Sequence, residues 1–165
     1  MTRTVWFTEI ESPAGPLRLG ADAEGLRRLD FLASPRARPR PADWVRDPSA
    51  LAETVGQLQD YFGGRRRDFT MALAPEGTDF QRGVWRQLCH IPYGETISYA
   101  ELAARVGNPK ASRAVGLANG QNPIAIIIPC HRVIGANRGL TGFGGGIDAK
   151  IQLLAHEGAM LPGFG

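Results

Sequence analysis

The sequence predicts an α+β protein with a small antiparallel β-sheet and a helix in its amino-terminal half. A mostly helical, winged helix-turn-helix-like half carrying a reactive cysteine follows. Three observations support this prediction. Short apolar runs separated by turn residues occupy the first 32 positions, N-capping signatures recur after Thr78, and Gly-Asn-Pro joins two short helical segments at 107–109. We therefore divide the chain into an amino-terminal domain, 1–77, and a carboxyl-terminal domain, 78–165.

The composition is that of a folded protein. The chain has 165 residues, of which 43% are hydrophobic, and this is enough to form a core. It contains no stretch of about 18 apolar residues and begins without the long apolar segment of a signal peptide, so we expect a cytoplasmic protein with no membrane partner. The formal net charge is +3, and the basic excess lies after residue 77, which is compatible with a polyanionic partner.

The amino-terminal half predicts a β-meander followed by a helix. Runs at 5–10, 17–21 and 26–32 are separated by Pro-Ala-Gly-Pro and Ala-Glu-Gly turns, which is typical of neighbouring strands. A further strand is expected at 69–73. The predicted helix covers 49–62, because its apolar residues recur at helical spacing and two glycines follow them. Those apolar residues are Leu51, Val55, Leu58 and Phe62.

Three helices are predicted in the carboxyl-terminal half. Thr78-Asp79-Phe80-Gln81 resembles a capping box and begins a helix that extends to Leu88; Ser98 begins a second helix in the same way, ending at Gly107. The third helix covers 110–119. Its alanines at 111, 114 and 118 form a flat stripe, suited either to another helix or to a narrow groove. Arg113 lies in its first turn, where a cation opposes the helix dipole and a phosphate would relieve the mismatch.

The run Ile-Ile-Ile-Pro-Cys-His-Arg-Val-Ile at 126–134 is the strongest candidate for chemistry. Its β-branched residues favour a buried strand ended by Pro129, which would place Cys130, His131 and Arg132 at a cleft. A second Cys-His pair, Cys89 and His90, lies near a helix end where a thiolate is disfavoured. We interpret Cys89 as a core or near-core thiol; a buried structural cysteine remains the alternative for Cys130 itself.

Neither a metal site nor a disulfide is expected from these cysteines. Adjacent residues of an extended chain point in opposite directions, so Cys130 and His131 cannot easily bind one metal ion. Two cysteines in a reducing compartment remain thiols. The Pro/Arg-rich segment 34–41 carries charge that could meet nucleic acid, although a solvated loop is the simpler interpretation.

Four segments of the second half resemble the O6-alkylguanine-DNA alkyltransferases, which repair alkylated guanine by moving the alkyl group to their own cysteine. They are Ile-Pro-Tyr-Gly-Glu-Thr-Ile-Ser-Tyr-Ala-Glu-Leu-Ala from 91, Gly-Asn-Pro-Lys-Ala-Ser-Arg-Ala-Val-Gly from 107, the segment 122–135 with Pro-Cys-His-Arg-Val, and Leu-Leu-Ala-His-Glu-Gly from 153. The resemblance is close over 78–160 and one of layout over 1–77.

The resemblance implies a reaction in which Cys130 is the nucleophile. His131 would act as its base through a water molecule, and Glu157 would orient the imidazole, in a relay of the triad type. Asn122 corresponds to a hinge asparagine that braces the turn before the active-site strand. Without the resemblance, Glu157 would be interpreted as a solvated acid at a helix end. No cofactor is implied.

The resemblance also implies a partner, which is double-stranded DNA containing alkylated guanine. Arg113 would fill the space left by an extruded nucleotide, and Tyr99 would turn the target phosphate and reach the base. A surface arginine and a core tyrosine are the alternatives. The helix at 110–119 would enter the minor groove, with the DNA contacts Ala111, Ser112, Ala114 and Gly116. We expect a monomer in solution; the residues leave cooperativity on DNA open.

The implied substrate pocket combines Tyr99, Ala125, Lys150 and the glycines Gly144 and Gly145. Ala125 and Gly144 replace a proline and a serine of some relatives, and Lys150 could equally be a solvent-facing helix residue. The expected function is irreversible, stoichiometric transfer of an alkyl group from O6-alkylguanine, and less so from O4-alkylthymine, to Cys130 after base flipping. A non-catalytic lesion sensor and a cysteine hydrolase are the alternatives.

Overall fold

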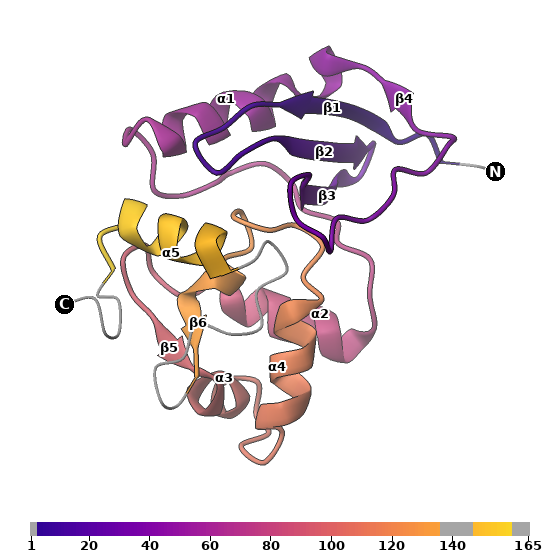
Figure 1. Cartoon of the computed structure of the whole chain (residues 1–165). Helices are drawn as coiled ribbons and strands as arrows, with labels where there is room; N and C mark the ends of the chain where they lie inside the picture. The colour runs from indigo at the N-terminus through magenta and orange to yellow at the C-terminus, as the bar shows by residue number, and fades with distance from the viewer. Residues whose placement is uncertain (1–2, 136–146, 160–165) are drawn as a thin grey trace.

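The computed structural model describes residues 3–135 and 147–159. A β-sheet and helix α1 form the upper layer in Figure 1, and the helices of the second half lie below them. Helix α5 (Ile147–His156), close to the carboxyl terminus in sequence, returns to a position directly beneath the upper layer. The two halves of the chain therefore contact each other at this helix, where His156 Nε2 lies 2.7 Å from the Tyr61 carbonyl oxygen.

The sheet has four strands in the order β3-β2-β1-β4. Strands β1 (Trp6–Ile10), β2 (Leu17–Asp22) and β3 (Gly25–Phe31) form the predicted antiparallel meander. The short strand β4 (Val45–Arg46) was not predicted, and it pairs parallel to β1, so the sheet is mixed rather than purely antiparallel. The prediction of a strand at 69–73 is wrong, since only a single bridge forms there, between Leu73 and Leu26.

Helix α1 (Ala52–Phe62) follows a 3₁₀ turn, η1 (Pro48–Leu51), as the apolar spacing at 49–62 predicted. Leu58 and Tyr61 are fully buried on its inner face. Gln57 on the same face donates to Thr70 Oγ1 at 2.8 Å and accepts from the Thr70 amide at 2.9 Å. This exchange satisfies the backbone amide of Thr70, within the segment where the extra strand was expected.

The two helices predicted from the capping residues Thr78 and Ser98 begin directly after them, whereas the third begins at 112 instead of 110. Thr78 and Gln81 form a reciprocal capping box at the start of α2 (Asp79–Leu88). The Ser98 hydroxyl accepts from the Glu101 amide at 3.0 Å and begins α3 (Tyr99–Arg105). Helix α4 (Ser112–Gly120) packs on both, and the indole of Trp85 in α2 donates to the Ala118 carbonyl at 2.9 Å. Helices α3 and α4 form the predicted helix-turn-helix.

The prediction of a buried strand over 126–134 is largely wrong. Ile126 has a φ of +71°, and the chain there turns, with the amide of Ile128 donating to the carbonyl of Ile124 at 3.0 Å. Cys130–Arg132 then forms a 3₁₀ turn, η2. Only β6 (Val133–Ile134) is extended, and it pairs parallel to β5 (Ile97–Ser98). The segment is held by turns and side chains rather than by a strand ladder.

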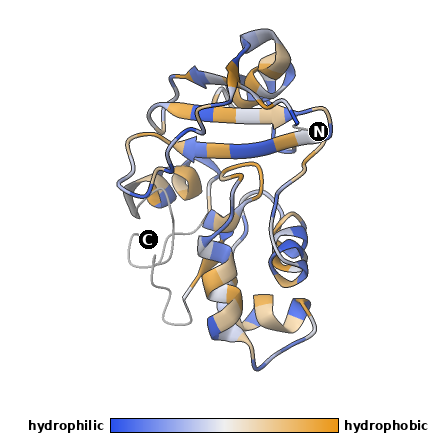
Figure 2. Ribbon diagram, turned by 90° about the vertical axis from the view of Figure 1, so that its right-hand side faces the viewer, coloured by the Kyte–Doolittle hydropathy of each residue, from blue (hydrophilic) through white to orange (hydrophobic). Residues whose placement is uncertain are grey.

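One apolar core spans both halves of the chain. Leu29 of β3 forms a bridge with Ile124, and its amide donates to the carbonyl of Pro123 at 2.9 Å. The core includes Leu17, Leu58, Leu88, Ile124, Val133 and Leu153, all at most 1% exposed. Figure 2 shows hydrophobic residues on the strands and on the segments that lie directly below them. Among the described residues, no helix is long and apolar enough to cross a membrane.

Candidate active site

Cys130 lies at the start of η2, in the wall of a cavity of about 260 Å³. The residue is 5% exposed. Asn122 and Ala125 line the same cavity, and the segment Ser34–Arg38 of the amino-terminal half contributes part of its wall. The thiol is thus shielded by protein yet borders a hollow. Part of the Pro/Arg-rich segment lines that hollow, while most of the segment is an exposed loop, as expected.

Asn122 holds the turn that carries Cys130. Its amide Nδ2 donates to the Ile128 carbonyl at 2.7 Å, and its Oδ1 accepts from the Ile124 amide at 3.0 Å. These two bonds replace the strand pairing that the run lacks. Burial raises the pKa of the Cys130 thiol, and the side-chain hydrogen bond from Asn122 and the charge of Lys150 act against that rise.

Lys150 is fully buried beneath the Cys130 segment, so it is not a solvent-facing helix residue. Its Nζ donates to the Val133 carbonyl at 2.7 Å. Burial lowers the pKa of Lys150 to about 8, and the negative form of Cys130 would raise it. A buried ammonium beside the cysteine favours the thiolate over the thiol.

His131 and Glu157 form a buried pair next to the cysteine. His131 Nε2 lies 2.8 Å from Glu157 Oε2, and the two residues are 0% and 5% exposed. Arg132 adds a bidentate contact, with Nε 2.8 Å from Oε1 and Nη2 2.9 Å from Oε2. The interpretation of Glu157 as a solvated acid is therefore wrong, and its carboxylate is the centre of a buried network.

The network determines the protonation of its members. Burial by itself would raise the pKa of Glu157, but the hydrogen bonds and charges of His131 and Arg132 outweigh it and hold that pKa well below its usual range. Burial lowers the pKa of His131, against the opposing effect of Glu157. The pair therefore consists of a carboxylate and a neutral imidazole that donates from Nε2.

Two members of this network were not singled out from the sequence as site residues. Arg132 was noted only as a neighbour of Cys130, although its guanidinium holds Glu157 and also donates to the Ile91 carbonyl at 2.7 Å. The hydroxyl of Tyr61, on α1, donates to Glu157 Oε2 at 2.6 Å. The local signal for Tyr61 was its place three residues after Leu58 on the core face of the predicted helix.

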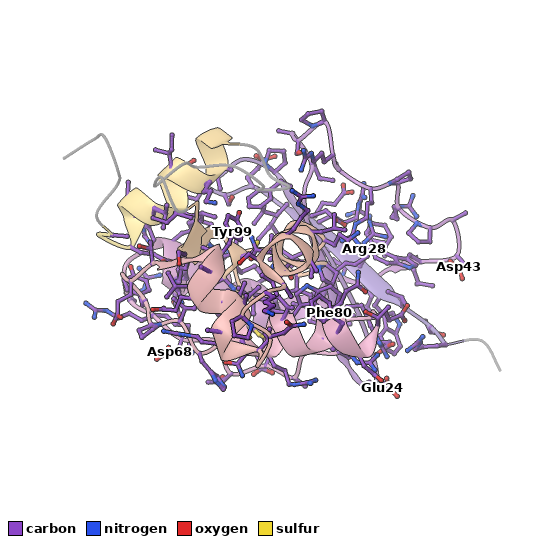
Figure 3. The ribbon with its side chains drawn as sticks, turned by 90° about the horizontal axis from the view of Figure 1, so that it is seen from below. Glu24, Arg28, Asp43, Asp68, Phe80 and Tyr99 are labelled. Atoms are coloured by element: carbon purple, nitrogen blue, oxygen red, sulfur yellow. The ribbon has the colours of Figure 1, made fainter. Side chains whose placement is uncertain are left out.

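The candidate DNA face lies on α3 and α4. Arg113 and Ala114 are exposed, whereas Ala111, Ser112 and Gly116 are half-buried. Tyr99 lies between the two helices in Figure 3, and a Cβ at Gly116 would be 3.6 Å from its Cδ1. The alanine stripe does not form a single surface, because Ala118 is buried against α2. The large apolar side chain exposed on α4 is that of Leu117, at 65%.

Two further predictions concern residues away from this face. Cys89 is exposed at the carboxyl end of α2, so its assignment as a core or near-core thiol is wrong. Partial burial nevertheless raises the pKa of its thiol. The pocket glycines Gly144 and Gly145 lie outside the described residues.

Together these features define a helix-turn-helix protein with a buried cysteine beside an imidazole–carboxylate pair. Residues 79–159 match the family model of the 6-O-methylguanine DNA methyltransferase DNA binding domain, and residues 5–75 match the ribonuclease-like domain of the same proteins. The chain belongs to the 6-O-methylguanine DNA methyltransferase family.

Relatives from an archaeon and a bacterium match over nearly their whole length. The methylated-DNA--protein-cysteine methyltransferase of Methanosarcina barkeri is 52% identical over 153 residues, which are 93% of this chain and 97% of the relative. The Mycobacterium tuberculosis protein of that name is 49% identical over 158 residues, or 96% and 95% of the two chains. The crystal structure of M. tuberculosis OGT in complex with DNA has a TM-score of 0.86 and 50% identity, covering 93% of this chain and 92% of that one.

Proposed function

We propose that this protein repairs DNA by moving an alkyl group, such as methyl, from the O6 atom of guanine in duplex DNA to the sulfur of Cys130. The observation that carries the proposal is the position of this thiol, at a cavity and beside the buried His131–Glu157 pair. The relatives named above support it by their names, and a DNA complex of one of them supports DNA as the partner.

The geometry supports a base mechanism for activating the thiol. Because burial raises the pKa of Cys130, the resting residue is a thiol and must lose its proton during the reaction. Since His131 donates from Nε2 to Glu157, its Nδ1 is the nitrogen that would accept that proton, through a water molecule. The imidazolium then formed is stabilised by the carboxylate. Asn122 and Lys150 stabilise the developing thiolate.

The bond changes make the protein usable once. The sulfur attacks the saturated carbon on O6, a carbon–sulfur bond forms, and the carbon–oxygen bond breaks with its electron pair leaving on guanine. A thioether offers no acyl or phosphoryl centre for water to attack, so Cys130 stays alkylated. O4-alkylthymine presents the same kind of carbon and would be a poorer substrate of the same pocket.

The substrate base must leave the helix before this reaction can occur. We propose that α4 enters the minor groove, with Ala111, Ser112, Ala114 and Gly116 near the backbone, and that Arg113 fills the vacated stack. Arg113 is exposed and forms no ion pair with any residue of 3–135 or 147–159, so its charge is available to DNA. Tyr99 would turn the target phosphate and contact the base.

Several finer assignments belong to the same proposal. The base pocket would be lined by Tyr99, Ala125, Lys150 and the glycines Gly144 and Gly145. The protein would act as a cytoplasmic monomer without a cofactor. Its amino-terminal domain would cover 1–77, and its DNA-binding and alkyl-transfer domain 78–165.

Intact-protein mass spectrometry tests this function directly. After incubation with duplex DNA containing O6-methylguanine, the protein should gain the mass of one methyl group, permanently, and peptide mapping should place it on Cys130. A lesion sensor would show no gain, and a cysteine hydrolase only a transient one. Either result would overturn the proposal.

A further inference from the structure

Tyr61 connects the amino-terminal half of the chain to the centre of the candidate active site. Its hydroxyl donates to Glu157 Oε2 at 2.6 Å, across 96 residues of sequence. The same oxygen accepts from His131 Nε2 at 2.8 Å and from Arg132 Nη2 at 2.9 Å. The carboxylate oxygen that faces the imidazole is thus shared among three donors, one of which comes from α1.

The ring of Tyr61 is held so that its hydroxyl cannot easily turn away. It is 0% exposed and packs between Phe69, at 5.5 Å between centroids, and the imidazole of His156, at 4.8 Å. His156 Nε2 also donates a hydrogen bond to the Tyr61 carbonyl at 2.7 Å. Such close packing leaves the ring little rotational freedom.

Tyr61 also stays protonated under all ordinary conditions. Burial, the charge of Glu157 and the hydrogen bond to it raise the pKa of the phenol well above its usual range. The hydroxyl is therefore a permanent neutral donor to the carboxylate. Its hydrogen bond partly compensates the negative charge on Oε2 without adding a cation near His131, whereas Arg132 adds one.

We propose that Tyr61 is a positioning residue of the alkyl-transfer site, which fixes Glu157 Oε2 toward His131 and adjusts how strongly that carboxylate attracts the imidazole proton. The inference rests on the proposed function. It makes helix α1 part of the active site, because the relay of Cys130, His131 and Glu157 receives one of its fixed hydrogen bonds from the other half of the chain.

The direction of the effect follows from the charges that surround His131. Lys150 acts on it from α5, Glu157 from the residue after that helix and Arg132 from η2. The Cys89 thiol, at the end of α2, lies within the field of Arg132. Removing the Tyr61 hydroxyl changes none of these formal charges. It leaves Oε2 with more negative charge for His131, so the pKa of the imidazole should rise.

The variant Tyr61→Phe tests this inference, with Tyr93→Phe as its matched control. Tyr93 belongs to the same aromatic cluster, 6.2 Å from Tyr61 between ring centroids, but its hydroxyl donates to the His156 carbonyl at 3.3 Å and not to Glu157. Single-turnover transfer from duplex O6-methylguanine is measured for each protein across the pH range, together with DNA affinity and thermal stability.

We expect Tyr61→Phe to slow transfer about tenfold and to move the acid limb of its pH profile to higher pH, with DNA affinity unchanged. Tyr93→Phe should keep the wild-type rate and profile. A Tyr61→Phe protein that is less stable but has the wild-type profile would overturn the inference and leave Tyr61 with a purely structural role. Absence of transfer by the wild-type protein would instead overturn the proposed function itself.

A second measurement covers the case in which Tyr61→Phe does not fold. Fluorinated tyrosine replaces the three tyrosines of the chain with isosteric, more acidic phenols. A stronger Tyr61 donor should move the acid limb in the opposite direction, to lower pH. An acid limb that stays in place would contradict the inference.

Discussion

At the scale of single residues, Glu157 determines the electrostatics of the site. Its two oxygens accept from Tyr61, His131 and, twice, Arg132, all of them buried. A buried carboxylate is tolerated only when its charge is compensated in this way. The same bonds that stabilise the charge also orient His131, so stability and chemistry depend on one side chain.

Glu157→Gln should therefore damage both properties. The neutral amide leaves Arg132 buried without its counter-charge, so we expect the free energy of unfolding to fall by about 3–5 kcal/mol. Methyl transfer should slow about a hundredfold or more, since the imidazole loses its orienting charge. Urea denaturation and single-turnover kinetics measure the two effects.

A matched control is Glu101→Gln, which breaks the exposed pair of Glu101 with Arg105 on α3. Exposed pairs contribute at most about 1 kcal/mol, so its stability should barely change. Equal stability losses in the two variants would show that Glu157 contributes no more to stability than a member of an exposed ion pair.

Cys130→Ala should abolish methyl transfer and keep binding to DNA, because the thiol reacts but lies away from the exposed face of α4. Cys89→Ala is the matched control, and it should transfer methyl at the wild-type rate. Labelled duplex DNA and an electrophoretic binding assay check both proteins. Retained transfer in Cys130→Ala would identify a different acceptor.

At the scale of elements, the helices were predictable because their signals are local. The capping residues of α2 and α3 lie within four positions of the amides they bond, so the sequence displays them directly. The turn at 124–132 depends instead on the side chain of Asn122 and on a positive φ at Ile126, which β-branched residues rarely adopt. Propensity therefore predicted a strand where tertiary contacts impose a turn.

The same reasoning explains which parts of the site could be foreseen. The run at 126–134 singled out Cys130 and His131, whereas their roles and the place of Glu157 came from a resemblance to a family; the structure pairs His131 with Glu157 next to Cys130. The role of Tyr61 could not be read locally, since its partner is 96 residues away. The exposure of Cys89 was likewise missed, because the helical spacing of α2 does not indicate what packs on its last turn.

Helix α4 gives a prediction about DNA. Arg113→Ala should slow repair of duplex DNA about tenfold or more, because nothing then fills the space of the extruded nucleotide, while reaction with free O6-alkylguanine base should keep its rate. Arg86→Ala, an exposed arginine on α2, is the control and should leave both rates unchanged. Equal slowing of both substrates by Arg113→Ala would exclude a role in base flipping.

At the scale of the whole molecule, the buried network joins segments from both halves. Tyr61 belongs to α1, His131 and Arg132 to η2, and Glu157 follows α5. The common core across the Leu29–Ile124 bridge reinforces this connection. We expect the sheet and the helix-turn-helix to unfold together, since each loses buried partners without the other.

This arrangement predicts acid sensitivity. The unfolded chain protonates a histidine near pH 6.5 and a glutamate near pH 4.5, whereas folding lowers the pKa of both His131 and Glu157. The unfolded state therefore binds more protons, and stability should fall as the pH drops below about 6.5 and more steeply below about 4.5. Urea denaturation at several pH values measures this.

Glu157→Gln removes the titrating carboxylate, so its stability should depend less on pH below about 4.5. A wild-type free energy of unfolding that stays constant from neutral to acid pH would contradict the prediction.

The two cysteines differ in a way that affects a protein used only once. Cys130 is enclosed and protonated at rest, so oxidants and stray electrophiles encounter little reactive sulfur until damaged DNA arrives. Cys89 is the thiol that the surface presents to such reagents. Adventitious oxidation should therefore mark Cys89 first and spare the repair capacity of the molecule.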